Sequence, residues 1–193
     1  MTTLTLNLNP TLILDDEQFI SICQHNQNLN FERNQKGELI IMPPTGSEIG
    51  QKNCSLSGQL WAWNNRYKLG IGFDSSTGFK LPNGAIRSPD VSWIKLERWQ
   101  QLTYEERRKF APICPDFLIE LLSLNDEIED TRKKMMEYLE NGLQLGWLID
   151  PQSKIIEIYR SNQPITILNN PATISGEDIL PNFVLDLTDI FTD

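Results

Sequence analysis

The run FLIELLS, residues 117–123, carries one glutamate among side chains that are otherwise apolar up to its final serine. A strand that is apolar at nearly every position is typical of a sheet that is covered on both faces. A carboxylate inside such a strand costs several kcal/mol unless a cation or a hydrogen-bond donor pairs with it. Glu120 is therefore the first candidate for a functional residue.

Two long helices are predicted on either side of this strand. In residues 45–70 apolar side chains recur at helical spacing up to the glycine that ends the segment. Residues 125–142 predict the second helix, with Asn125 or Asp126 near its cap and Gly142 at its end. The apolar positions of the first helix are Ile49, Leu56, Leu60, Trp63 and Tyr67.

Shorter elements occupy most of the remaining chain. A short helix is expected at 17–26, a hairpin at 29–42, and further strands at 71–95, at 145–160 and in the C-terminal tail. Residues 96–110 are polar and predict a loop with one short helix. These elements together predict an α/β fold, bordering on α+β, in which a central mixed β-sheet is flanked by helices.

Size and composition are typical of one soluble globular domain. The chain has 193 residues, of which 39% are apolar and 22% charged. We predict a single domain over residues 15–193, preceded by a loose N-terminal arm of residues 1–14.

No run of about 18 apolar residues predicts a transmembrane helix, and no leader pattern is present, so a cytoplasmic location is expected. Three widely spaced cysteines fit a reducing compartment.

A second acid, Asp90, lies in the predicted strand SPDVSWI, residues 88–94. If the strands of Asp90 and Glu120 are neighbours, the two side chains come within about 5 Å of each other. Carboxylates that close repel, and one takes up a proton unless a divalent cation lies between them. Such oxygen ligands suit Mg²⁺ or Mn²⁺. Asp116 is a poorer partner, because four residues along one strand separate it from Glu120 by roughly 13 Å.

Two lysines, Lys133 and Lys134, lie in the helix that is predicted after the Glu120 strand. On the inner face of that helix, a lysine reaches the carboxylate pair. Its ammonium group there orients an attacking water or stabilises phosphoryl charge. Glu48, near the start of the first long helix, is a candidate fourth member of this catalytic set.

Six stretches, taken in order, carry a family resemblance. Together they resemble the Uma-two family of bacterial endonucleases, which is expanded in cyanobacteria and belongs to the PD-(D/E)XK restriction-endonuclease-like superfamily. The resemblance runs from about residue 15 to the C-terminus. The stretches are MPPTGSEIGQKN (42–53), SPDVSWI (88–94), IELLS (119–123), KMMEYLENG (134–142), LGWLIDP (145–151) and LPNFVLDL (180–187).

The resemblance implies a restriction-endonuclease-like core with αβββαβ topology. It implies that Asp90, Glu120 and the carbonyl oxygen of Leu121 hold a Mg²⁺ or Mn²⁺ ion. It also implies that Lys134 supplies positive charge at the catalytic centre and that Glu48 lies near the metal.

The sequence departs from the superfamily pattern at Leu122, where the (D/E)XK motif has its lysine. The resemblance implies that the lysine comes from the following helix instead, as Lys134. This departure leaves catalytic activity an open question.

Each candidate also has a purely structural interpretation. Asp90, at a strand start, could bond backbone amides. Lys134 could form a helix-surface ion pair with Asp130, four residues earlier, and Lys133 is expected to face solvent. Glu48 could merely favour the helix N-terminus through the macrodipole.

Other conspicuous residues are assigned structural roles. The single histidine, His25, is expected at the surface or at a helix end, and the basic run at 107–109 on a solvated face. Four tryptophans are expected in the core: Trp61, Trp63, Trp93 and Trp147.

Three functional hypotheses follow. The first is a metal-dependent endonuclease that hydrolyses phosphodiester bonds in DNA, working as a homodimer because a duplex has two strands to cut. The second is a non-catalytic protein of the same fold that binds nucleic acid or another protein; the net charge of −9 and Leu122 favour it. The third is a metal-dependent hydrolase of a smaller substrate.

Overall fold

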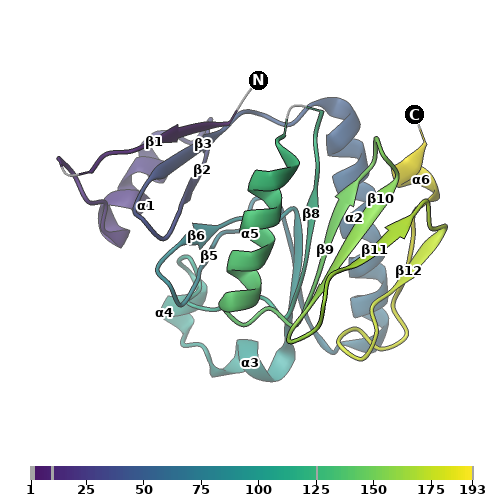
Figure 1. Ribbon diagram of the computed structural model, residues 1–193. Helices are drawn as coiled ribbons and strands as arrows, with labels where there is room; N and C mark the ends of the chain where they lie inside the picture. The colour runs from purple at the N-terminus through teal and green to yellow at the C-terminus, as the bar shows by residue number, and fades with distance from the viewer. Residues whose placement is uncertain (1–2, 10, 125, 193) are drawn as a thin grey trace.

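The computed structural model describes residues 3–9, 11–124 and 126–192. A six-stranded sheet forms its centre, in which β8 and β9 run parallel and all other neighbours antiparallel (Figure 1). None of the described helices is long and apolar enough to cross a membrane. The predicted α/β fold with a central mixed sheet flanked by helices is confirmed. In spatial order the strands are β11 (Thr166–Asn169), β10 (Ile155–Arg160), β9 (Leu145–Asp150), β8 (Phe117–Leu121), β7 (Val91–Lys95) and β4 (Gly70–Asp74).

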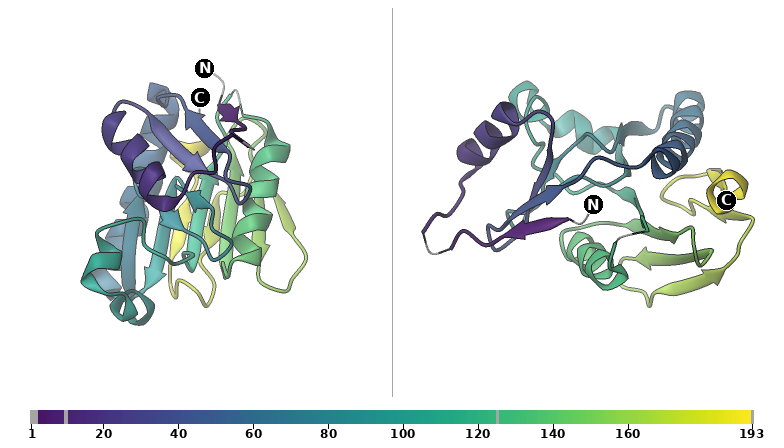
Figure 2. Two further views of the ribbon diagram at one scale, coloured as in Figure 1. Left: turned by 90° about the vertical axis from the view of Figure 1, so that its left-hand side faces the viewer. Right: turned by 90° about the horizontal axis from the view of Figure 1, so that it is seen from above.

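A second sheet is built mainly from the N-terminal residues, which lie to one side of the six-stranded sheet (Figure 2). Helix α1 (Asp16–His25) packs on it through the fully buried Phe19 and is capped by Asp15. The predicted hairpin is present as β2 and β3. The segment before residue 15, expected as a loose arm, adds β1 to this sheet. Its strands in spatial order are β1 (Leu4–Leu6), β3 (Leu39–Met42), β2 (Asn30–Arg33), β6 (Ile86–Arg87) and β5 (Phe79–Lys80).

Two long helices, α2 (Ser47–Tyr67) and α5 (Ile128–Glu140), cover opposite faces of the six-stranded sheet (Figure 2). Along β8, Ile119 packs in the core on the α2 side, whereas Leu118 packs in the core on the α5 side. Side chains alternate between the faces of a strand. The strand carries apolar side chains on both faces because the sheet is covered on both sides, as predicted.

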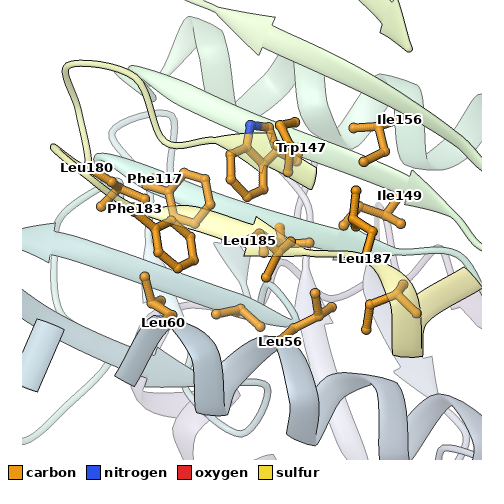
Figure 3. Close-up of a cluster of buried hydrophobic side chains, with 14 of the residues drawn as sticks. Leu56, Leu60, Phe117, Trp147, Ile149, Ile156, Leu180, Phe183, Leu185 and Leu187 are labelled. Atoms are coloured by element: carbon orange, nitrogen blue, oxygen red, sulfur yellow. The ribbon is translucent and has the colours of Figure 1, made fainter. Parts of the chain in front are cut away.

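The C-terminal segment completes the core on the α2 side of the sheet. The ring of Phe183 stacks on Trp147 with centroids 6.1 Å apart and meets Phe117 at 6.4 Å. Figure 3 shows these rings beside Leu56 and Leu60 of α2. The elements of this segment are β12 (Thr173–Ser175), β13 (Val184–Asp186) and α6 (Thr188–Phe191).

Helix α5 is the crossover between the parallel strands β8 and β9, a connection that parallel neighbours require. Its N-cap is Glu127 rather than Asp126, and Asn125 lies outside the described residues. Gly142 follows the helix with a φ of 107°, a conformation that favours glycine. The crossover lays α5 along the face of the sheet that carries Glu120.

Two expectations were wrong in detail. Trp61 is 67% exposed, whereas the other three tryptophans expected in the core are buried. It follows the buried Leu60 on α2, and the rotation of about 100° per residue turns its side chain towards solvent. Residues 96–110 hold two short helices, α3 (Leu96–Gln101) and α4 (Tyr104–Arg107), instead of one. His25 ends α1 in an exposed position, as expected.

Candidate active site

Glu120 lies on the α5 face of β8, and two side chains of α5 bind it. Lys134 Nζ is 2.9 Å from Glu120 Oε1 and 3.1 Å from Oε2. The Tyr138 hydroxyl donates a hydrogen bond to Oε1 at 3.0 Å. Both side chains lie on one face of the helix because residues four apart are neighbours there. These contacts allow the sheet to hold a carboxylate that is only 6% exposed.

Asp90 lies directly before β7, beside Glu120. The β7–β8 register, extended by one step, places Asp90 opposite Glu120, so the condition for a carboxylate pair, that the two strands are neighbours, is met. Asp90 Oδ2 accepts a hydrogen bond from the backbone N–H of Leu121 at 2.8 Å. Asp90 Oδ1 accepts one from Asn53 Nδ2, on α2, at 2.9 Å. Both carboxylate oxygens of Asp90 are thus held by hydrogen bonds. The bond from the Leu121 N–H is of the kind expected if Asp90 binds a backbone amide at the start of its strand.

The two carboxylates lie in surroundings that oppose their ionisation. Burial raises the pKa of Glu120 to about 7; Lys134 acts to lower this pKa, while the charges of Asp90 and Glu32 raise it. Burial likewise raises the pKa of Asp90, against the hydrogen bond from Leu121 and the attraction of Lys134. A carboxylate with a raised pKa binds a proton more readily than an exposed one, and a divalent cation can replace that proton.

Glu32, on β2, is a further member of this cluster, and sequence reasoning did not single it out. Its Oε1 is 2.9 Å from Lys134 Nζ, and its Oε2 accepts a hydrogen bond from Arg87 Nη1 at 2.9 Å. Arg87 Nε donates in turn to Glu137 Oε2 at 2.6 Å. Burial alone would raise the pKa of Glu32, but Lys134 and Arg87 outweigh it, and that pKa is lowered.

The sequence held only a weak signal for Glu32. It is a carboxylate inside a predicted strand, the criterion that selected Glu120, but its neighbours are mostly polar. Polar surroundings predict an exposed strand, in which a glutamate needs no partner. In the folded protein Glu32 is only 2% exposed, and it is bound by Lys134 of α5 and Arg87 of β6.

Glu48 lies in the first turn of α2. Its side chain is 60% exposed and accepts a hydrogen bond from Lys52 Nζ at 2.7 Å. Lys52 is buried and adjoins Asn53, which holds Asp90. Within the described part of the chain, no hydrogen bond or ion pair joins Glu48 to the carboxylates of the cluster.

Lys133 and Asp116 lie away from the cluster. Lys133 Nζ binds Asp130 at 2.7 Å on the exposed face of α5, so the surface pair considered for Lys134 belongs to Lys133. Asp116 lies before β8, at the end of the strand remote from Glu120, and its carboxylate pairs with Arg98 at 2.9 Å. Asp116 is therefore held by structural contacts.

Leu122 occupies the position of the usual (D/E)XK lysine and has an apolar environment. It is 5% exposed and packs in one core cluster with Met135 and Tyr138. The ammonium group at Glu120 comes from Lys134 on α5 instead.

The cluster has charge and donor atoms that fit a divalent cation. With four carboxylates and two cations, it has two surplus negative charges when every group is ionised. Among the described residues no three His, Cys, Asp or Glu side chains form a ready metal centre, so further ligands would be neutral oxygens. Asn53 Oδ1 is one such atom, because it is buried without a hydrogen-bond partner. The charged members are Glu32, Asp90, Glu120, Glu137, Arg87 and Lys134.

Comparison with known proteins assigns the chain to a family. A family model described as "Uma2: Putative restriction endonuclease" matches residues 16–188. The chain belongs to the Uma2 family. The Uma2 chain is also similar to a solved structure from Anabaena variabilis ATCC 29413, titled a putative nuclease belonging to DUF820. The identity is 22% and the TM-score 0.70, over 83% of this chain and 89% of that one. No curated protein matches.

Proposed function

We propose that this Uma2 protein is a Mg²⁺- or Mn²⁺-dependent endonuclease that hydrolyses phosphodiester bonds in DNA. The observation that carries the proposal is the pair of desolvated carboxylates, Asp90 and Glu120, with Lys134 in contact with Glu120. A cation at the pair supplies a Lewis acid that activates water and stabilises charge on the phosphate. Family membership supports phosphodiester hydrolysis over other metal-dependent reactions.

The roles of the protein groups follow from their contacts. Lys134 carries the ammonium group that orients the attacking water and stabilises negative charge in the transition state. Tyr138 and Asn53 keep the carboxylates of Glu120 and Asp90 in place. We assign the carbonyl oxygen of Leu121 as a metal ligand and Glu48 to the outer shell of the metal.

Binding of DNA must rely on local contacts, because the net charge of −9 repels a polyanion. The basic run at 107–109 lies at the end of α4. Arg107 donates a hydrogen bond to the carbonyl oxygen of Gln100 at 3.0 Å, and Arg108 lies over the ring of Tyr104, so these two arginines contact α3 and α4. We expect DNA binding that needs the divalent cation and weakens steeply with salt. A homodimer is proposed because a duplex has two strands to cut.

Calorimetric titration with Mn²⁺ tests the metal site without any knowledge of the DNA target. We expect the wild type to bind Mn²⁺, and the Glu120→Gln variant to bind at least about tenfold more weakly. Glu157→Gln is a matched control, because Glu157 is likewise buried, at 2% exposure against 6% for Glu120, and is bound by an α5 cation, Arg132. Failure of the wild type to bind at millimolar Mn²⁺ would contradict the proposal.

Nicking of supercoiled plasmid DNA then tests the reaction. We expect Mg²⁺-dependent nicking by the wild type and its loss in Asp90→Asn and Lys134→Met. Nicking that persists in both variants would assign the activity to a contaminant or to another site.

A non-catalytic binding protein is the second candidate, and one observation favours it. Glu120 is already paired with Lys134 and Tyr138, so the fold satisfies this carboxylate without a metal. This candidate predicts binding of nucleic acid or protein that survives in a metal chelator. The third candidate, hydrolysis of a small substrate, predicts metal binding with no affinity for DNA even at low salt.

A further inference from the structure

Two carboxylates from different sheets share the ammonium group of Lys134. Glu120 on β8 and Glu32 on β2 each place an oxygen 2.9 Å from Lys134 Nζ. An ammonium group has three N–H donors, so it can serve both carboxylates at once. The Lys134 side chain is only 15% exposed, so water competes little for these bonds.

Glu32 is itself held firmly. The backbone N–H of Ser88 donates to Glu32 Oε1 at 2.8 Å, and Arg87 donates to Oε2. Arg87 also binds Glu137, which lies three residues after Lys134 on α5. The contacts therefore form a closed chain from α5 through β2 and β6 back to α5. Because both of its oxygens are bound, Glu32 is fixed in position relative to Lys134.

We propose that Glu32 is a positioning residue, which holds Lys134 between two carboxylates and so keeps Glu120 available to a divalent cation. The inference rests on the proposed function. Without Glu32, Glu120 is the one ion-pair partner of the ammonium group that remains among the described residues, and the two pair more tightly. A cation must then displace that lysine to reach Glu120. The hairpin of β2 and β3 is by this argument part of the active site.

Glu157 offers a control for purely structural effects. It is as deeply buried as Glu32, and it too binds a cation of α5, Arg132, at 3.0 Å. Arg132 is bound to Glu157 and Glu129 rather than to Glu120. Loss of either buried carboxylate leaves a cation of α5 with one partner fewer, but only loss of Glu32 changes the ion pair at Glu120.

The first measurement is the Kd for Mn²⁺ of the folded wild type, Glu32→Gln and Glu157→Gln, with urea unfolding run in parallel. We expect both variants to lose stability. Only Glu32→Gln is expected to weaken Mn²⁺ binding, by about tenfold, as for other residues that orient a metal ligand. An unchanged Kd in Glu32→Gln, or an equal loss in Glu157→Gln, overturns the inference. Absence of binding by the wild type overturns the proposed function and, with it, this inference.

The second measurement separates positioning from a direct effect of the Glu32 charge on the cation. The Kd is compared between Lys134→Gln and the double variant Lys134→Gln/Glu32→Gln. Positioning through Lys134 predicts equal Kd values, because the lysine that Glu32 holds is already absent. A tenfold loss that persists without Lys134 shows direct electrostatic action and overturns the inference.

Should Glu32→Gln fail to fold, Glu32→Asp takes its place. It keeps the charge but retracts the carboxylate from Lys134 by one methylene group. An intermediate loss of Mn²⁺ affinity is expected, and a wild-type Kd in this variant overturns the inference.

Discussion

We expect the Glu120 carboxyl group to make Mn²⁺ binding at the proposed site depend on pH. Burial raises the pKa of Glu120 to about 7, so below this pH the folded protein holds a proton that the cation must displace. We therefore expect the Kd for Mn²⁺ to weaken about tenfold for each pH unit below about 7, and to level off above it. Calorimetry between about pH 6 and pH 8 measures this. A Kd that is constant over this range would contradict the prediction that Glu120 both ligates the metal and has a pKa near 7.

At Leu122 we expect that introducing the usual (D/E)XK lysine lowers the stability of the protein. The side chain is 5% exposed in an apolar cluster with Met135 and Tyr138. Leu122→Lys puts an unpaired ammonium group there and is expected to cost about 3 kcal/mol or more of unfolding free energy. Urea denaturation measures the loss. Leu122→Met, which nearly conserves volume, should cost less than about 1.5 kcal/mol.

At the scale of elements, helix α2 contains a glycine, Gly58, at a position where an alanine side chain would meet no neighbouring atom. A Cβ atom added at Gly58 meets no heavy atom within 4 Å. We expect Gly58→Ala to raise the free energy of unfolding by about 0.5–1 kcal/mol, because glycine loses more backbone entropy in a helix. Gly70, at the start of β4, is the contrast. A Cβ there would lie 2.2 Å from the carbonyl oxygen of Ile94, so Gly70→Ala should destabilise the protein.

In helix α5, helical periodicity shows which residues share a face, but it does not show which face packs on the sheet. Met135 and Tyr138 are three residues apart and therefore share one face of the helix, and both are fully buried. Neighbouring lysines differ by about 100° around a helix axis, so Lys133 and Lys134 cannot face the same surroundings. Which of the two faces Glu120 depends on how the helix is rotated over the sheet, and the structure selects Lys134.

At the scale of the whole molecule, the C-terminal segment closes the core against the six-stranded sheet. Phe183 is 3% exposed and contacts the rings of Trp63, Trp147 and Phe117. Phe183→Ala is expected to lower the free energy of unfolding by about 3–5 kcal/mol through lost burial and a cavity. Urea denaturation with an unchanged m value is the measure. The adjacent Val184→Ala, at a 57% exposed position, should change stability by less than about 0.5 kcal/mol.

The sequence by itself determined much of the fold, because local chemistry encodes it. Helical spacing predicted α2, a capping residue and a terminal glycine predicted α5, and the apolar run around Glu120 predicted a sheet covered on both sides. The same local reading, an acid within an apolar strand, selected Glu120. It left open whether the strands of Asp90 and Glu120 are neighbours, and the structure pairs β7 with β8. These predictions needed only side-chain polarity at successive positions and the periods of strand and helix.

Tertiary structure alone decided how the catalytic candidates are held. Glu32 and Arg87 lie 55 residues apart in the chain, and both lie far from Lys134, yet they form one buried network. Polar residues in short strands carry no signal of burial, because the elements that cover them come from elsewhere in the chain. Trp61 shows the converse, since a large apolar side chain is exposed where no element covers it. Local sequence specifies which surfaces can be buried, and the docking of one sheet and helix on another specifies which of them are.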